Sequence, residues 1–359
     1  MTFLPVSHES LQQAAQILRN GGLVAFPTET VYGLGADAFN AEALAKIFEV
    51  KNRPRFDPLI IHIASLDTLE KVTDMSQLSE ETKRKLFSLA EKFWPGPLSL
   101  VLPKNEKIPG IATAGLSTAA IRFPSHEAAQ TLISLSGTAV AAPSANPFGS
   151  LSPTRAEHVR EKLGDKIDMI LDGGPTQIGV ESTVLDITGK SIKILRHGGT
   201  PKEEIEKLIG RVEENVSNAE ASGGLSSANE VSGGLASPGQ LKSHYSPQKP
   251  LSVFSREEMI RLPYEADAAY LFFDGSARDA WLEAREQQEG QGRLDTHGRP
   301  EALVLRTFSE KGAVLEASAC LFEILHELEK CRISRIFAQF APFEGLGAAI
   351  NDRLSRASK

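Results

Sequence analysis

Three cationic side chains lie within five positions in the segment KNRPRFDPLIIHI, residues 51–63: Lys51, Arg53 and Arg55. Two prolines interrupt this cluster. Proline removes a backbone donor and pushes the residue before it toward an extended conformation, so we expect a non-helical loop and not a charged helix face. An apolar, strand-like run follows at once. The pattern predicts a rigid cationic loop at the mouth of a buried strand, which suits an anionic ligand.

Further polar residues are found where predicted strands end or turn, and functional groups of open α/β sheets collect at such places. Thr118 and Arg122 are four positions apart on one predicted strand and therefore share a face. Arg196 ends another predicted strand and is soon followed by two glycines. Guanidinium groups beside hydroxyls and glycine-rich backbone describe a phosphate or carboxylate pocket. The polar candidates in chain order are Thr28, Glu29, Thr30, Tyr32, Lys51, Arg53, Asp57, His62, Thr118, Arg122, Ser144, Asn146, Ser152, Ser182, Thr183 and Arg196.

Each candidate also has an ordinary structural explanation. A single arginine at a strand end most often forms a surface ion pair, His62 fits a satisfied core histidine, and the segment PSAN fits a turn. The case for a site therefore depends on the set, because several rigid, proline-containing polar loops in one domain exceed what turns alone require.

Standard nucleotide, hydrolase and zinc motifs are missing from the sequence. It has no G-x-x-x-x-G-K-[ST] loop, no G-x-S-x-G elbow and no H-E-x-x-H or Cys/His cluster. The segment GLGADA matches G-x-G-x-x-A, but the predicted helix begins only after Asn40, too late for a dinucleotide-binding turn. These observations count against a P-loop, a dinucleotide site, a serine hydrolase and a zinc site.

Length and composition indicate two soluble domains. The chain has 359 residues, of which 41% are hydrophobic and 24% charged. No apolar run approaches the roughly 20 residues that span a bilayer, and residues 1–13 do not resemble a signal peptide. Two cysteines, Cys320 and Cys331, make no disulfide framework. We expect a cytoplasmic protein, and the net charge of −7 argues against nonspecific nucleic-acid binding by the whole surface.

Residues 1–210 alternate between helical and strand-like patterns. Seven or eight strands with interspersed helices predict an α/β domain, and consecutive late strands without helices between them predict a mixed sheet. The expected helices are 9–22, 40–50 with Asn40 as N-cap, 79–94, 125–135, 155–163 and 201–209. The expected strands are 23–27, 59–63, 98–102, 119–123, 139–142, 169–172, 182–187 and 192–196.

The composition changes near residue 215. Residues 216–237 are rich in Ser, Gly and Ala and repeat SGGL, so we expect a flexible tether there. Residues 238–247 add specific polar groups and are interpreted as a lid over a nucleotide. From about 250 a smaller α/β pattern begins, with strands expected at 251–254, 268–273, 302–308 and 335–340 and helices at 311–331 and 346–357. The predicted division is 1–210, a linker at 211–249, and 250–359.

Seven segments in this order and spacing resemble the YrdC/TsaC family: FPTETVYGLGADA, KNRPRFDPLIIHI, FWPGPLSLVL, AIRFPSH, AAPSANPFGSLSPT, GVESTVLDI and ILRHGG. The tail SPGQLKSHYSPQKPL and the ending GLGAAINDRLSRA resemble the long, two-domain form. The resemblance implies a YrdC-like twisted mixed sheet joined by a linker to a small Rossmann-like α/β domain.

The activity implied by the resemblance is that of a nucleotidyltransferase, L-threonylcarbamoyladenylate synthase. It makes threonylcarbamoyl-AMP and pyrophosphate from L-threonine, bicarbonate and ATP, and other proteins transfer the threonylcarbamoyl group to adenosine 37 of ANN-decoding tRNAs. Mg²⁺ is expected with ATP, held by phosphate oxygens and water, so no protein metal ligands are expected. No covalent nucleophile is expected, and Lys51 and Arg53 would act electrostatically.

The resemblance also implies residues for each substrate. It places Arg53, Asp57, Thr118, Ser144, Ser152 and Arg196 at ATP, where we also expect Lys51, Asn146, His244 and Tyr245. It places Thr30, His62, Arg122, Ala142 and Ser182 at threonine, with Arg122 on the amino-acid carboxylate.

Two other classes of function stay open. One is an RNA-binding module of the same fold, and direct contact with tRNA is left undecided. The other is a carbamoyl-phosphate-handling transferase of the hydrogenase-maturation type, against which the low cysteine count argues. Downstream threonylcarbamoyl-transfer proteins are expected partners, and a membrane is not.

Overall fold

The computed structural model of the chain describes residues 1–214, 245–289 and 304–358. The predicted tether, most of the predicted lid and His244 lie outside the described residues. The chain divides into two compact units. The first contains Met1–Phe148, Ser152–Gln177 and Glu181–Gln240, and the second contains Gly149–Leu151, Ile178–Val180 and Leu241–Lys359.

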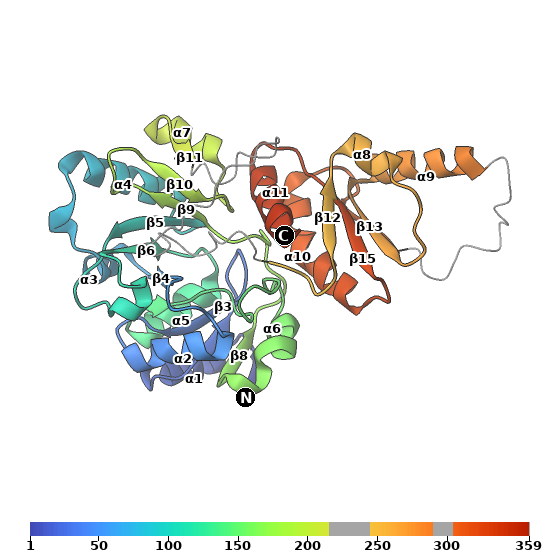
Figure 1. Cartoon of the computed structure of the whole chain (residues 1–359). Helices are drawn as coiled ribbons and strands as arrows, with labels where there is room; N and C mark the ends of the chain where they lie inside the picture. The colour runs from blue at the N-terminus through green and yellow to red at the C-terminus, as the bar shows by residue number, and fades with distance from the viewer. Residues whose placement is uncertain (215–244, 290–303, 359) are drawn as a thin grey trace. The chain divides into compact units, whose positions relative to one another are not determined.

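The first unit is built on an eleven-stranded sheet with helices on its faces (Figure 1). Its helices are α1 (His8–Arg19), α2 (Ala41–Lys51), α3 (Leu69–Val72), α4 (Glu80–Phe93), α5 (Glu127–Ser136), α6 (Ala156–Leu163) and α7 (Lys202–Ile209). Its strands are β1 (Thr2–Pro5), β2 (Val24–Phe26), β3 (Gly33–Asp37), β4 (Ile60–His62), β5 (Leu98–Pro103), β6 (Thr118–Arg122), β7 (Val140–Ala141), β8 (Met169–Asp172), β9 (Thr183–Asp186), β10 (Lys193–Arg196) and β11 (Glu213–Glu214).

Polar N-caps start helices α1 and α2, and one of them, Asn40, was predicted from the sequence. Asn40 caps α2, because its side chain accepts from the backbone N–H groups of Glu42 at 3.0 Å and Ala43 at 3.1 Å. Ser7 caps α1 in a reciprocal capping box with Ser10. These polar caps satisfy N–H groups that the helices themselves leave unpaired.

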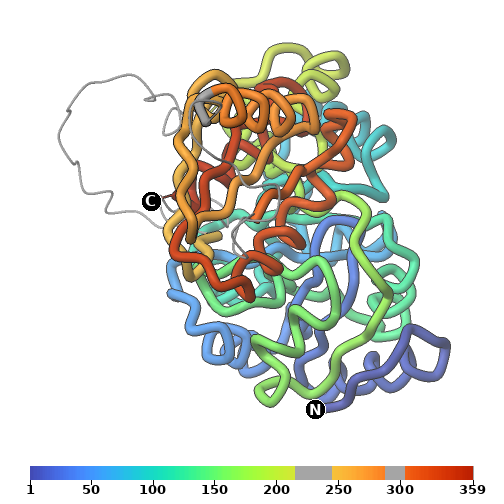
Figure 2. Tube along the Cα trace, turned by 90° about the vertical axis from the view of Figure 1, so that its right-hand side faces the viewer, coloured from blue at the N-terminus to red at the C-terminus, as the bar shows by residue number. Residues whose placement is uncertain are grey.

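The strand order is β1-β8-β2-β3-β7-β4-β6-β5-β9-β10-β11. Five adjacent pairs are parallel and five antiparallel, which confirms the predicted mixed sheet. The N-terminal strand β1 pairs with β8, and Figure 2 shows this blue N-terminal segment beside the green part of the chain. Residues far apart in sequence therefore meet across neighbouring strands.

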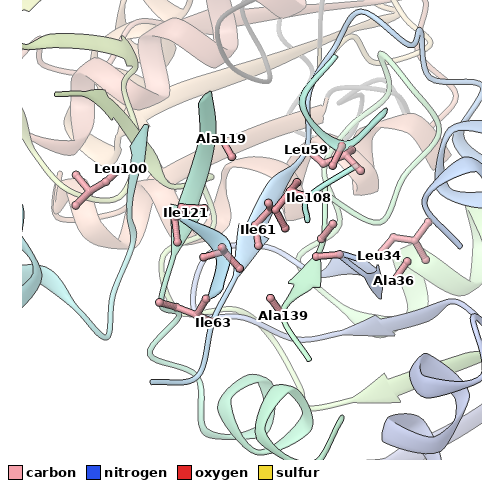
Figure 3. Close-up of a cluster of buried hydrophobic side chains, with 14 of the residues drawn as sticks. Leu34, Ala36, Leu59, Ile61, Ile63, Leu100, Ile108, Ala119, Ile121 and Ala139 are labelled. Atoms are coloured by element: carbon pink, nitrogen blue, oxygen red, sulfur yellow. The ribbon is translucent and has the colours of Figure 1, made fainter. Parts of the chain in front are cut away.

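Alternate residues of the central strands point to opposite faces, as strand geometry requires. On one face Ile61, Leu100 and Ile121, from β4, β5 and β6, belong to a core cluster that also includes apolar residues of α2 and α4 (Figure 3). On the opposite face α1 and α5 pack on β2 and β8, in a second cluster containing Leu11, Leu18, Val24, Phe26, Leu132, Ile133, Met169 and Leu171. The two clusters hold the central strands in a fixed position.

Two sequence expectations are wrong in detail. The sheet has three strands that were not predicted, β1, β3 and β11. β1 and β11 are short edge segments, and β3 reads GLGAD, whose glycines weaken the strand signal although β2 and β7 pair with it. The non-helical loop was predicted to begin at Lys51, but it begins one residue later, because Lys51 is the last residue of α2. Asn52, with φ 50° and ψ 41° in the left-handed region, ends the helix.

The second unit contains a four-stranded, all-parallel sheet in the order β12-β15-β13-β14, in agreement with the predicted Rossmann-like α/β domain. Its strands are β12 (Leu251–Phe254), β13 (Ala268–Asp274), β14 (Val304–Ser309) and β15 (Arg335–Gln339), and its helices are α8 (Arg256–Arg261), α9 (Gly275–Glu289), α10 (Val314–Lys330) and α11 (Leu346–Ala357). In its core the ring of Tyr270 packs at a tilt against Trp281 and Phe337, with centroids 4.7 and 5.3 Å away. None of the helices in the described residues is long and apolar enough to span a membrane.

Candidate functional site

One row of paired residues crosses the central strands and carries two of the predicted arginines. In this row His62 of β4 is the register partner of Arg122 of β6, and Arg122 is the partner of Ser99 of β5. Ser99 is level with Val184 of β9, which pairs with Arg196 of β10. Directly paired residues project from the same face where the register is regular, as it is from His62 to Val184. The register shifts at Arg196, and its hydrogen bond to the Ser182 hydroxyl, which is 2.8 Å from that of Ser99, brings it to this face. Three strand spacings of about 4.8 Å separate the backbones of Arg122 and Arg196, or about 14 Å of sheet.

The row shares its face with a small apolar cluster that contains only strand residues: Ile60, Val101, Ala120, Val184 and Leu195. The helical residues of α2 and α4 pack on the other face, with Ile61 and Ile121. A polar row beside a strand-built apolar patch is the usual composition of a small-molecule site.

A buried ion pair lies at the end of β6. Arg122 Nη2 is 2.7 Å from Oε1 of Glu29, which lies in the loop between β2 and β3, and the two side chains are 4% and 3% exposed. Arg122 Nε donates to the Gly96 carbonyl at 3.3 Å. In the described part of the chain neither Glu29 oxygen nor Arg122 Nη2 makes a hydrogen bond, so the two groups are close but not aligned. Buried polar atoms without hydrogen-bond partners are uncommon in folded proteins, and a ligand or water that pairs with them is one explanation.

His62 is a neutral neighbour of this pair. Burial, and next the charge of Arg122, lower the pKa of His62 to about 3. Its ring meets Phe26 edge-on, with centroids 6.4 Å apart. Within the described chain its buried Nδ1 has no hydrogen-bond partner. His62 therefore presents a neutral hydrogen-bonding group beside a cation.

The other residues predicted for threonine lie close to the same strands. Ser182 precedes β9, and its hydroxyl is 2.8 Å from that of Ser99 in the row. Thr30 is buried next to Glu29, with its hydroxyl 2.8 Å from that of Thr28. Ala142 follows β7, and its N–H donates to a carbonyl of β4 at 2.9 Å. The structure thus gathers this set around β4 and the neighbouring strand ends.

Lys51 joins the end of α2 to the loop after β7. Its Nζ donates to the carbonyl of Ser144 at 2.6 Å and to that of Asn146, and Phe148 N–H donates to the Lys51 carbonyl at 2.7 Å. Burial lowers the pKa of Lys51 well below its usual value, and the Arg53 charge adds to this effect. Lys51 therefore fixes the loop that carries Ser144 and Asn146.

Arg53 and Asp57 form a second buried ion pair, with Nη2 to Oδ2 at 2.9 Å. Arg53 also donates to the carbonyls of Asp57 at 3.1 Å and Pro58 at 2.8 Å, which fixes the loop. Burial raises the pKa of Asp57, whereas the charges of Arg53, Lys51 and Arg196 lower it. Thr118 begins β6, and the register of β4 with β6, continued back two residues, places it level with Pro58.

Arg196 is held against the start of β9. Its Nε and Nη2 donate to the Ser182 carbonyl at 3.1 and 2.9 Å, and Nη2 also donates to the Ser182 hydroxyl at 3.1 Å. Gly198 allows this approach, because a Cβ there would lie 2.2 Å from the Glu181 carbonyl oxygen and 2.3 Å from the Ser182 carbonyl carbon. Ser152 Oγ donates to Glu181 Oε1 at 2.5 Å.

Sequence reasoning missed two of these residues. Ser99 is a hydroxyl inside the apolar run LSLVL, and a polar residue in a buried strand was a usable signal. Glu181 precedes Ser182, accepts from Ser152, and raises the pKa of Lys51 through its charge. Nothing in its spacing distinguished it from an ordinary surface carboxylate.

Tyr245 is the predicted ATP residue that the structure places in the second unit. Its ring packs 5.7 Å from that of Phe322, and the Arg353 guanidinium lies over it at 5.0 Å. It is 1% exposed, and its φ of 63° is in the left-handed region. Its contact with ATP stays a prediction. Among the described residues there is no cluster of three or more His, Cys, Asp or Glu side chains that could hold a metal ion.

Comparison with known proteins finds relatives that match almost the whole chain. Residues 16–198 match the Sua5/YciO/YrdC family, described as "Telomere recombination", and residues 200–359 match the family described as "Threonylcarbamoyl-AMP synthase, C-terminal domain". The chain is 40% identical over 353 residues to the threonylcarbamoyl-AMP synthase of Pyrococcus abyssi, covering 96% of this chain and 93% of that protein. It is 39% identical over 358 residues to that of Bacillus subtilis, covering 99% and 94%.

A solved structure supports the fold. The crystal structure of P. abyssi Sua5 complexed with L-threonine matches with a TM-score of 0.78 and 38% identity, covering 99% of this chain and 96% of that chain. The structure of a doubly substituted variant of the same P. abyssi protein matches equally, with a TM-score of 0.78. Similarity of this length and level, together with both family matches, shows that this chain belongs to the Sua5/YciO/YrdC family in its long, two-domain Sua5 form.

Proposed function

We propose that this chain is an L-threonylcarbamoyladenylate synthase, a nucleotidyltransferase that forms threonylcarbamoyl-AMP and pyrophosphate from L-threonine, bicarbonate and ATP. The curated relatives that match almost the whole chain carry the name threonylcarbamoyl-AMP synthase. The observation that carries the proposal is the pairing of Arg122 and the neutral His62 on the same sheet face as Arg196, with the Lys51–Arg53 loop nearby.

In this proposal the two substrates meet across the row. Arg122 binds the threonine carboxylate, since a guanidinium matches a carboxylate with two parallel hydrogen bonds. His62, neutral because its pKa is about 3, is suited to the threonine hydroxyl. Arg53, Arg196 and the loop fixed by Lys51 are suited to the phosphates and the nucleotide.

The chemistry needs positive charge already in place. The threonine amine condenses with bicarbonate to give an N-carboxy species and water, and a carboxylate oxygen of that species attacks the α-phosphorus while pyrophosphate leaves. Two anions must approach each other, and fixed cations in a water-poor site lower that barrier without having to reorganise. No side chain needs to form a covalent bond to substrate. Mg²⁺, bound with ATP, would neutralise phosphate charge, and the chain's own cations would orient the triphosphate.

The test is threonine-dependent release of pyrophosphate. Purified protein is incubated with ATP, Mg²⁺ and bicarbonate, with and without L-threonine, and pyrophosphate and AMP-linked products are measured. Release that requires both threonine and bicarbonate supports the proposal. Release that is independent of threonine, or its complete absence in folded protein, contradicts it.

An RNA-binding module of the same fold is the alternative. The cations that the site gathers are buried, with Lys51 1%, Arg53 8%, Arg122 4% and Arg196 6% exposed, so they do not form a surface that could follow an RNA backbone. An RNA affinity that falls steeply with salt, measured without ATP, would favour this alternative. Hand-over of the product to threonylcarbamoyl-transfer proteins that modify adenosine 37 of ANN-decoding tRNAs, in the cytoplasm, belongs to the same proposal.

A further inference from the structure

Glu29 is the buried acidic group that the proposed reaction has not yet used. It lies in the loop between β2 and β3, its side chain is 3% exposed, and its Oε1 is 2.7 Å from Arg122 Nη2. In the described residues neither of its carboxylate oxygens has a hydrogen-bond partner. Removing a carboxylate from water without hydrogen bonds costs free energy, which the charge of Arg122 offsets in part and a ligand that donates hydrogen bonds to Glu29 would lower further.

The loop holds Glu29 rigidly in this position. Thr28 Oγ1 accepts from the N–H groups of Thr30 at 3.2 Å and Val31 at 3.3 Å, and it lies 2.6 Å from the Val31 carbonyl. These bonds close a tight turn around Glu29 and fix its backbone on both sides. The backbone from which the Glu29 side chain extends to Arg122 is therefore held by the chain's own hydrogen bonds.

The charge pattern at this point matches one class of ligand. Arg122 offers a cation and Glu29 an anion side by side, with hydrogen-bonding capacity unused on both. A simple carboxylate would satisfy Arg122 but would face the negative charge of Glu29. An α-amino acid carries a carboxylate and an ammonium group on the same carbon, so it can satisfy both side chains at once.

We propose that Glu29 binds the α-amino group of the amino-acid substrate, and that the Arg122–Glu29 pair selects α-amino acids over other small carboxylic acids. This inference rests on the proposed function, because it takes threonine as the ligand of Arg122. Glu29 then acts as a specificity-determining residue, and its negative charge keeps metabolic hydroxy acids and other plain carboxylates away from the arginine.

The experiment compares two ligands that differ only at this group: L-threonine and 2,3-dihydroxybutanoate, in which a hydroxyl replaces the amino group. Their dissociation constants are measured by calorimetry without ATP, for the full-length wild type and for Glu29→Gln. Wild-type protein should bind threonine at least about tenfold more tightly than the hydroxy acid, as expected for a charge-assisted hydrogen bond. In Glu29→Gln the ratio should fall to about threefold or less. The hydroxy acid should then bind more tightly than it does to wild type, because Arg122 is no longer opposed.

Two further variants make the test specific. Glu127→Gln removes one carboxylate from an exposed position in the first turn of α5, and it should leave both affinities unchanged. Glu29→Asp keeps the charge and should keep the preference for the amino group. It replaces Glu29→Gln in the test if the Gln variant does not fold. Folding of each variant is checked by its thermal midpoint.

The outcomes are separable. If both ligands weaken by the same factor in Glu29→Gln, Glu29 only positions Arg122 and the inference is overturned. If wild-type protein binds the hydroxy acid as tightly as threonine, the inference is overturned without any variant. If wild-type protein binds threonine normally and the ratio does not change in Glu29→Gln, the inference fails and the proposed function stands. If wild-type protein binds neither ligand, the inference is overturned, and the proposed function is decided separately by threonine-dependent pyrophosphate release.

Discussion

Replacing His62 with glutamine should make the first unit less sensitive to acid. Burial lowers the pKa of His62 to about 3, whereas an unfolded chain has a histidine pKa of roughly 6.5. The folded state therefore resists protonation and the unfolded state accepts it. The contribution to stability is complete above pH 6.5 and is lost progressively as the pH falls from there toward 3.

The size of the effect follows from the two pKa values. A pH of 5 is roughly 1.5 units below the pKa of histidine in the unfolded chain, so that histidine is protonated, while His62 in the folded protein is still neutral. At roughly 1.36 kcal/mol per pH unit, this difference lowers the free energy of unfolding by about 2 kcal/mol. Glutamine does not titrate, so the difference in unfolding free energy between wild type and His62→Gln should shrink by about 2 kcal/mol between pH 7.5 and pH 5.

The measurement is urea unfolding monitored by tryptophan fluorescence at several pH values. The chain has two tryptophans, Trp94 in the first unit and Trp281 in the second. A Trp281→Phe background leaves Trp94 as the reporter of the first unit, which avoids treating two units as one transition. His8→Gln is the control, because His8 is exposed and its removal should leave the pH dependence as in wild type.

Other groups titrate in the same range, and the comparison separates them from His62. Burial also lowers the pKa of His126, so wild type and variant should both lose stability in acid, with the variant losing less. Parallel pH profiles for wild type and His62→Gln would refute the assignment of a buried neutral His62. They would also remove the reason for placing a neutral hydrogen-bonding group beside Arg122.

Three further predictions concern the loop, the lid and the amino acid. Lys51→Met should weaken ATP binding about ten- to a hundredfold in calorimetry, because the carbonyls of Ser144 and Asn146 lose the donor that positions their loop; wild-type affinity would contradict this. Deleting residues 232–235 should leave pyrophosphate release nearly unchanged, because loop-closure costs grow slowly with length, while Tyr245→Ala should lower it; the opposite pattern would reverse the assignment of tether and lid. Threonine should be the best substrate, serine roughly 10–200-fold poorer and valine poorer still, and valine outperforming serine would show that the pocket does not read the hydroxyl.

Elements with strong local signals could be predicted from the sequence. Helix α2 follows its cap Asn40, and β2 is a short apolar run buried on both faces. Strand β3 could not be predicted in this way. Its two glycines carry little strand propensity, and it exists because β2 and β7 supply hydrogen bonds on both sides. In such segments, pairing with neighbouring strands decides whether a strand forms.

The site was predictable as a set of residue types but not as a set of contacts. Arg122 and His62 were both candidates, yet only the register of β4 with β6 places them side by side. The partner of Arg122 is Glu29, from a loop far earlier in the sequence, and no spacing rule connects them. Lys51 was expected to point at phosphate, and its Nζ in fact donates to two backbone carbonyls. Pairings of this kind depend on the packing of distant segments.

The position of β1 at the edge of the sheet has a consequence for how the protein is made. β1 ends at Pro5, and its partner β8 begins at Met169, so a ribosome must add roughly 160 residues before the two can pair. At translation speeds of about 5–20 residues per second, this takes on the order of 8–30 s. During that time the nascent chain holds β2 without the neighbour that covers one of its edges, since β8 lies between β1 and β2. An apolar strand with an unpaired edge is prone to pair with other chains, so the strand order of the first unit sets how long β2 is open to such pairing during synthesis.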